Sequence, residues 1–217
     1  MPNSESGDPS RASRRFFLRS ASLAATAGVL AGSGAALAAA NAAPGNAAGT
    51  SDPRDAKRMR DLAAWTALTF KTSNPVPYGC EIFHTQSGES FLRAANAVFP
   101  EHDPSAHAEL RAIRLACKKL NADSLEGYTL YTTCEPCAMC MGCILWAGID
   151  RMVYGATMDD SLRFGPNIMI PAAEVAKRSV MKCIVSGPVE REACLALFTN
   201  PAMKKVFDRW KANGTNL

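Results

Sequence analysis

The sequence predicts an α/β protein in which helices pack against a central sheet. From Pro53 onward, segments with apolar residues at helical spacing alternate with short strand-like runs, and this alternation is typical of layered α/β folds. The composition, 47% hydrophobic and 20% charged, is that of an ordinary soluble chain. The stretch from residue 55 to residue 217 is long enough for one domain of ordinary size.

Residues 1–43 differ from the rest of the chain. The pair Arg14-Arg15 precedes a run from Ser22 to Ala40 that consists mostly of Ala, Gly, Ser, Leu and Val, and small residues suited to cleavage lie at its end. The segment resembles a twin-arginine export signal, which implies a periplasmic or secreted protein with no stable membrane anchor. A retained anchor is one alternative, although a run so poor in Leu and Ile would insert poorly. A disordered tail is another.

The charge gives no support for a polyanionic partner. Lys and Arg number 24, and Asp and Glu number 20. Residues 1–43 contain four of the basic and two of the acidic residues, so the remainder has 20 minus 18, a net charge of +2. This charge is too small to predict nucleic-acid binding.

Residues 44–54, rich in Ala, Gly, Asn and Pro, are predicted to be a linker that precedes the domain at 55–217. Apolar periodicity predicts a first helix at 52–71, and two strands at 79–85 and 90–96 are expected to form a hairpin. A loop at 98–104 then leads to a helix near His107. The later elements are expected to be a strand at 129–133, a helix at 137–147 that Gly148 ends, a strand at 151–155, a helix at 172–178, a strand at 180–185, and helices at 189–198 and 201–211.

The helix that begins near His107 has one apolar stripe. Its predicted core face consists of Ala106, Leu110, Ile113, Cys117 and Leu120. The basic residues of this helix lie off the stripe and are expected to be solvated; they are Arg111, Arg114, Lys118 and Lys119.

Two separated motifs predict a metal site. They are His107-Ala108-Glu109 and Cys134-Glu135-Pro136-Cys137-Ala138-Met139-Cys140. Cys137 and Cys140 share one face of a helix, and all three ligands are expected at helix N-termini, where the dipole favours thiolate. One imidazole and two thiolates can hold zinc and leave its fourth position open. Such an ion lowers the pKa of water, and Glu109 would carry the protons.

Other interpretations of the cysteines remain open. In an exported chain, Cys-x-x-Cys could belong to a disulfide framework or a redox dithiol. A structural zinc site would need a fourth ligand, which Cys134 or Cys143 could supply. The joint pattern with His107 and Glu109 is more specific than either. Of eight cysteines, the six outside the site could form up to three disulfides, although Cys117 is expected to be buried.

Several stretches around these motifs resemble one known family. They are Asn96-Ala97-Val98, residues 103–109 and 112–114, residues 130–137 with Met139-Cys140, and residues 151–156. Together they resemble the cytidine and deoxycytidylate deaminase superfamily over roughly residues 55–197, and within it the guanine deaminase and tRNA adenosine deaminase branch. The implied fold is a three-layer α/β/α sandwich around a mixed central sheet of about five strands.

The resemblance also implies a set of site residues. Zinc would be held by His107, Cys137 and Cys140, and Glu109 would be the proton carrier. The implied substrate contacts are Asn96, Ala108, Asp160 and Phe164. From the residues alone, Asn96 could also be a strand-end turn residue, and Asp160 could equally be a solvated loop acid. Residues 159–171 depart from the family pattern, and substrate choice is expected to be made there.

The activity implied is zinc-dependent hydrolytic deamination of a purine base or nucleoside, with guanine (to xanthine) or guanosine favoured, by a homodimer. Adenosine deamination in tRNA is an alternative, against which stand the export signal, the low charge and the lack of a basic C-terminal tail. A non-catalytic zinc-containing purine-binding protein is a second alternative, and the presence of Glu109 argues against it.

Overall fold

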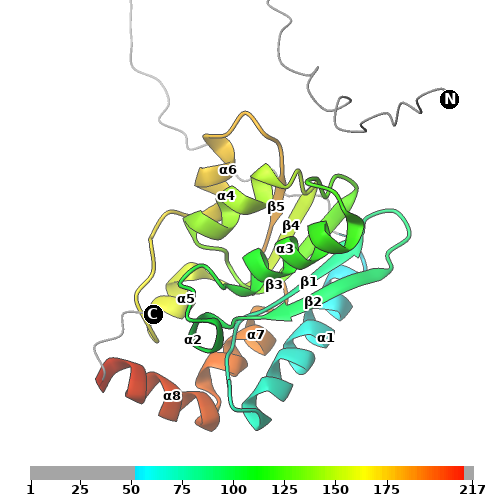
Figure 1. Ribbon diagram of the computed structural model, residues 1–217. Coiled ribbons are helices and arrows are strands. Elements are labelled where there is room, and N and C mark those ends of the chain that lie inside the picture. The colour runs from blue at the N-terminus through cyan, green and yellow to red at the C-terminus, as the bar shows by residue number, and fades with distance from the viewer. Residues whose placement is uncertain (1–51, 213–217) are drawn as a thin grey trace, which may run out of the picture. The chain divides into compact units, whose positions relative to one another are not determined.

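The computed structural model describes residues 52–212, whose helices and strands are arranged as in Figure 1. The predicted export signal at 1–43 and most of the predicted linker at 44–54 lie outside the described residues. None of the helices within residues 52–212 is long and apolar enough to cross a membrane.

A mixed five-stranded sheet forms the centre, in the order β2-β1-β3-β4-β5. The strands are β1 (Gly79–His84), β2 (Ser90–Ala95), β3 (Tyr128–Cys134), β4 (Arg151–Ala156) and β5 (Ile184–Ser186). β1 pairs antiparallel with β2 and β3, whereas β3, β4 and β5 are parallel. The β1–β2 turn contains Gly88 at φ 75°, a left-handed conformation that glycine adopts without strain. The expected mixed sheet and hairpin are confirmed.

Helices cover both faces of the sheet (Figure 1). One layer contains α3 (Ala108–Leu120), α4 (Ala138–Trp146) and α6 (Ala172–Lys177), and the other contains α1 (Asp55–Ala67), α7 (Arg191–Thr199) and α8 (Pro201–Ala212). Each layer encloses its own hydrophobic cluster against the sheet. The predicted three-layer α/β/α sandwich is therefore confirmed.

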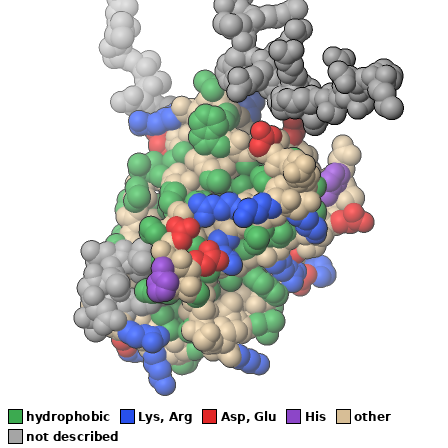
Figure 2. Space-filling view, in the orientation of Figure 1, with side chains coloured by type: hydrophobic (Ala, Val, Ile, Leu, Met, Phe, Trp, Pro, Cys, Tyr) green, Lys and Arg blue, Asp and Glu red, His purple; other side chains and the backbone are tan. Residues whose placement is uncertain are grey.

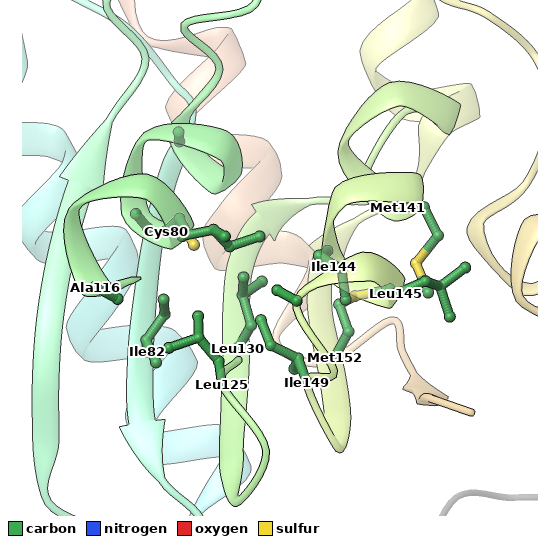
Figure 3. Close-up of a cluster of buried hydrophobic side chains, with 14 of the residues drawn as sticks. Cys80, Ile82, Ala116, Leu125, Leu130, Met141, Ile144, Leu145, Ile149 and Met152 are labelled. Carbon is green, nitrogen blue, oxygen red and sulfur yellow. The ribbon is translucent and has the colours of Figure 1, made fainter. Parts of the chain in front are cut away.

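Alternate side chains of the strands supply these two clusters, as the two-residue period of a strand requires. Ile82, Leu130 and Met152 are directly paired in the register of β1, β3 and β4, and all three are fully buried. Figure 3 shows them beneath the helices that carry Ala116 and Ile144. Tyr131 and Val153, the next residues of β3 and β4, belong to the cluster on the opposite face.

Three local predictions differ from the structure. The last strand is not 180–185 but the three residues of β5, because only these meet β4, while Val180 is 97% exposed. The loop predicted at 98–104 contains a short helix, α2 (Val98–Glu101), and a further one, α5 (Met158–Leu162), was not predicted. The first helix ends in a 3-10 turn, η2 (Leu68–Lys71). Helices of four or five residues are too short to show a helical period.

The buried face of α3 also differs in part from the predicted stripe. Leu120 is 37% exposed and Cys117 is only half-buried. The face that contacts the sheet consists instead of small residues beside Ile113, namely Ala108, Ala112 and Ala116, which are fully buried. Alanines let α3 approach β1 and β2 closely, so side-chain size, as well as hydrophobicity, selects the inner face.

Candidate metal centre and substrate pocket

Three side chains meet where two helices begin. His107 and Cys137 are the N-cap residues of α3 and α4, and Cys140 lies in the first turn of α4. His107 Nδ1 lies 3.4 Å from Cys140 Sγ and 3.8 Å from Cys137 Sγ. The three ligand atoms lie within 4.8 Å of one another. The structure thus brings together all three predicted ligands, and all at helix N-termini.

Short backbone contacts fix both helix starts. Before α3, Asp103 Oδ1 accepts hydrogen bonds from the backbone N–H and the hydroxyl of Ser105, and the His107 N–H donates to the Ser105 carbonyl. Before α4, the Glu135 N–H donates to the carbonyl of Ala156, which anchors the cysteine motif to the end of β4. The ligands are therefore placed by the backbone rather than by long, mobile side chains.

Zinc fits this donor set. In a tetrahedral site with Zn–S about 2.3 Å and Zn–N about 2.0 Å, a sulfur and a nitrogen atom lie about 3.5 Å apart, and the measured 3.4 and 3.8 Å bracket this value. Neither Cys134 nor Cys143 belongs to the group, and the Cys134 thiol faces the carbonyl of Thr157 instead. Within residues 52–212 the site thus has three protein ligands, the number typical of catalytic rather than structural zinc.

The two ligand thiols differ in acidity. The adjacent Cys140 thiol and the His107 imidazole lower the pKa of Cys137 to about 4. The hydrogen bond with Cys137, together with burial, raises the pKa of Cys140. Because zinc binds thiolates, metal binding would release a proton, chiefly from Cys140. All eight cysteines of the chain are free thiols, so no predicted disulfide forms among them.

Glu109 lies beside the ligands without joining them. It occupies the first turn of α3 and is only 7% exposed. Its Oε1 accepts a hydrogen bond from Thr132 Oγ1 on β3 (3.1 Å), and its Oε2 lies 3.6 Å from Cys140 Sγ. Burial raises the pKa of Glu109, against the lowering effect of the His107 imidazole. A carboxyl group with a raised pKa can hold and return a proton nearer neutral pH.

The metal site opens into a cavity of about 400 Å³, a volume typical of small-molecule sites. Polar groups are few and lie mostly near the metal ligands. The lining residues are Tyr78, Asn96, Val98, Phe99, Pro104, His107, Glu109, Cys134, Glu135, Cys137, Met139, Pro166, Asn167 and Ile168.

Of the four predicted substrate contacts, only Asn96 lines this cavity. Its Oδ1 accepts a hydrogen bond from the backbone N–H of Val98 (3.2 Å), so it also has the turn role considered from the sequence. We find no hydrogen bond from its side-chain NH2 within residues 52–212. Ala108 is fully buried in the core and does not line the cavity.

Asp160 and Phe164 lie away from the cavity, contrary to the prediction. Asp160 accepts hydrogen bonds from Thr157 that cap α5, and both its oxygens accept from Arg191 (2.6 and 2.7 Å). Phe164 packs against Phe198 and Phe207 of α7 and α8, with ring centroids 5.5 and 5.2 Å apart. Arg191 and the two aromatic rings lie in later helices, so the local sequence gives no sign of these partners.

Other cavity residues were missed from the sequence. Tyr78 lies just before β1 and is bonded through its carbonyl to the N–H of Asn96, so the predicted hairpin register could have revealed it. Pro166, Asn167 and Ile168 come from the segment between α5 and α6, for which the sequence has no periodic signal. Glu135 lies within the cysteine motif, but the motif alone did not predict that its side chain lines the cavity.

The cavity wall formed by α2 is held by arginines of α3 that were predicted to be merely solvated. Arg111 binds Glu101 (2.8 Å) and Arg114 binds Asp103 (3.3 Å). Figure 2 shows basic side chains gathered over α3 with acidic ones beside them. These ion pairs tie the segment that carries Val98, Phe99 and Pro104 to the helix that carries His107.

Fold and donor set together define an α/β protein whose candidate zinc ligands lie beside a small-molecule cavity, and comparison with known proteins identifies its family. Residues 53–156 match the model of the cytidine and deoxycytidylate deaminase zinc-binding region. The chain is 35% identical over 126 residues to a probable cytosine deaminase of Schizosaccharomyces pombe, covering 55% of this chain and 75% of that protein. The chain therefore belongs to the cytidine and deoxycytidylate deaminase family.

Two further relatives differ in the substrate that their names give. A guanine deaminase of Bacillus subtilis is 43% identical over 89 residues, which cover 41% of this chain and 56% of that protein. A tRNA-specific adenosine deaminase of Aquifex aeolicus is 42% identical over 81 residues, covering 37% and 52%. The chain thus matches little more than half the length of these two relatives.

Solved structures agree with the fold. A guanine deaminase from Nitrosomonas europaea superposes with a TM-score of 0.62 at 24% identity, covering 73% of this chain and 86% of that one. A mutant protein in complex with 8-azaguanine gives 0.59 at 26% identity, covering 65% and 80%. A complex with 2,6-diaminopurine gives 0.58 at 26% identity, covering 70% and 80%.

Proposed function

We propose that this protein hydrolytically deaminates a purine base or nucleoside, with guanine or guanosine as the first candidate. The reaction replaces the amino group on C2 of guanine by a carbonyl oxygen from water, giving xanthine and releasing ammonia. The observation that carries the proposal is the buried Glu109 carboxylate beside three candidate zinc ligands, where Glu109, His107 and Cys137 line a cavity of about 400 Å³.

The chain's own residues divide the work. His107, Cys137 and Cys140 would hold zinc, which supplies the activation of water. Glu109 would accept a proton from the water and return it to the departing amine, while the Thr132 hydroxyl orients its other oxygen. The side-chain NH2 of Asn96 would donate to an acceptor on the base. Apolar walls such as Val98 and Phe99 exclude bulk water.

The role of Glu109 is tested by Glu109→Gln, which keeps the side-chain size and the acceptor for Thr132. Ammonia release from the preferred substrate should fall by roughly 10²–10⁴-fold, with zinc content unchanged. Glu126→Gln, an exposed position, is the control and should be fully active. Unchanged ammonia release in Glu109→Gln would show that Glu109 is not the proton carrier. No release from the wild-type chain with zinc bound would support the alternative of a non-catalytic zinc-containing purine-binding protein.

The substrate is tested by ammonia release from guanine, guanosine, adenosine and cytosine. Two similar structures bind purine analogues, 8-azaguanine and 2,6-diaminopurine, which favours a purine. Relatives named for cytosine and tRNA adenosine make those the competing substrates. Faster release from cytosine would replace the guanine assignment. Binding of tRNA in a gel-shift assay, together with inosine formation in that tRNA, would replace the guanine assignment by adenosine deamination in tRNA.

Two further proposals concern the protein's location and assembly. The twin-arginine pattern at Arg14-Arg15 supports export, and cell fractionation should find the shortened chain outside the cytosol. Trp146 on α4 is 80% exposed and Leu115 on α3 is 43% exposed, and apolar side chains left on these helices support a homodimer. Sedimentation at micromolar concentration should give twice the mass of one chain.

A further inference from the structure

One side chain of the cysteine motif joins the two ends of a cavity wall. Glu135 lies between the end of β3 and the turn into α4. Its Oε2 accepts a hydrogen bond from the backbone N–H of Met158 (3.1 Å), and its Oε1 accepts one from the N–H of Ala172 (3.0 Å). Met158 is the first residue of α5 and Ala172 the first of α6. A single carboxylate therefore receives both ends of the segment 158–172.

The middle of this segment has few other attachments. Its residues 166–168 line the cavity. Within residues 52–212, the backbone N–H groups of Gly165 and Ile170 donate to Ser161 and Ile168, inside the segment itself. The side chains of Ile168, Met169 and Ile170 are 57%, 45% and 43% exposed. Among the described residues, neither core packing nor hydrogen bonds to other elements fix residues 165–170, so the position of this stretch depends on the two ends of the segment.

The two ends of the segment also have contacts of their own. The first end is also held by the pairing of Asp160 with Arg191 and by the packing of Phe164. At the second end, Ala172 is fully buried in the cluster that α4 and α6 share, and among the described residues the α6 N-terminus is hydrogen-bonded to the metal motif through Glu135 alone. The Glu135 backbone is itself fixed to β4 through the carbonyl of Ala156, so it offers a rigid attachment point.

We propose that Glu135 is a positioning residue that sets the distance between the metal ligands and the wall formed by residues 158–172, and thereby the fit of the substrate. Glu135 lies two residues before Cys137 in the sequence. A change in the attachment of the wall to its carboxylate therefore changes the distance between the wall and the metal ligands. The kinetic part of this inference rests on the proposed purine deamination, whereas the structural part does not.

The first test is hydrogen–deuterium exchange of Glu135→Gln. Glutamine keeps the shape of the side chain but has only one acceptor oxygen. Its NH2 group would face one of the two backbone N–H groups and cannot accept a hydrogen bond from it. One of the two hydrogen bonds is therefore lost, and exchange in 158–172 should become on the order of tenfold faster. Glu174→Gln removes an acid of α6 that, among the described residues, pairs with Arg178 alone, and should leave exchange unchanged. Equal exchange in the two variants would overturn the proposal.

The second test is ligand affinity, measured by calorimetry with 8-azaguanine and by steady-state kinetics with guanine. In Glu135→Gln, Kd and KM should rise about tenfold while kcat changes by less than about threefold, and zinc should remain at one ion per chain. Faster exchange with unchanged Kd would overturn the functional part. An inactive wild-type chain would overturn the proposed function alone, because exchange and Kd are measured without turnover.

A second variant guards against misfolding of the first. Ala172→Pro removes the backbone N–H that Glu135 accepts and leaves the carboxylate in place. Proline is tolerated at the first residue of a helix, and Pro171, with ψ 143°, has the extended conformation required before a proline. The same rise in exchange and in Kd is expected. A folded Ala172→Pro variant with wild-type values would contradict the role of Glu135.

Discussion

The metal centre and the wall formed by residues 158–172 line the same cavity but are held in different ways. The ligands His107, Cys137 and Cys140 lie at two helix starts, each formed by a short run of sequence and fixed by short backbone contacts. The wall is held by side chains from elsewhere, Glu135 before it and Arg191 after it. The chemistry of the site is thus encoded locally and the shape of its pocket is encoded at long range. We expect changes to the two regions to have separable effects.

The largest effect is expected from a change in the metal centre. In Cys137→Ser, the hydroxyl does not ionise near neutral pH, so zinc should be lost and ammonia release should fall on the order of a thousandfold. The melting temperature should fall too, because metal binding stabilises the folded state. Zinc content, turnover and thermal unfolding are the measurements.

The matched control for that variant is Cys143→Ser, six residues further along α4 and outside the ligand group. It should keep one zinc ion per chain and most of its activity. A Cys137→Ser variant that retained zinc would show that the site has another ligand, and the separation between the two regions would no longer hold.

An intermediate effect is expected from Asp160→Asn in the wall. The hydrogen bonds from Arg191 hold the pKa of Asp160 at about 2, below the unfolded value of about 3.9. A lowered pKa stabilises the folded state fully above roughly pH 4, and this stabilisation is lost as pH falls through about 2. The variant should therefore lose on the order of 1–3 kcal/mol at pH 7, and little relative to wild type near pH 2. Urea unfolding at the two pH values measures both.

Asp159→Asn is the control, since Asp159 is exposed on the same short helix. It should unfold like wild type at both pH values. Zinc content should be normal in both variants, because neither residue contacts the metal ligands. A loss of zinc in Asp160→Asn would show that the wall and the metal centre are coupled, contrary to the separable effects expected here.

The same contrast explains what the sequence could and could not predict. The metal ligands and Glu109 were predictable, because the chemistry demands certain residue types at short spacings around two helix starts. The sheet was predictable from alternating strands, although β5 is shorter than expected because only three residues meet β4. Asp160 and Phe164 were misplaced because their partners, Arg191 and the rings of α7 and α8, lie in segments whose docking has no local signature.

The smallest effect is expected from Phe164→Leu, and it separates packing from substrate binding most finely. If Phe164 stacked on the base, losing the ring would cost about 1–3 kcal/mol of binding, a rise of roughly tenfold or more in KM. The structure instead packs the ring against Phe198 and Phe207. KM for guanine should therefore stay within about twofold, while unfolding free energy falls by about 1 kcal/mol. Phe198→Leu, at a ring that is 1% exposed, should lose more stability with the same KM. A KM that rises for Phe164→Leu alone would show that Phe164 contacts the substrate after all. It would also mean that side chains of the wall turn towards the ligand when one binds.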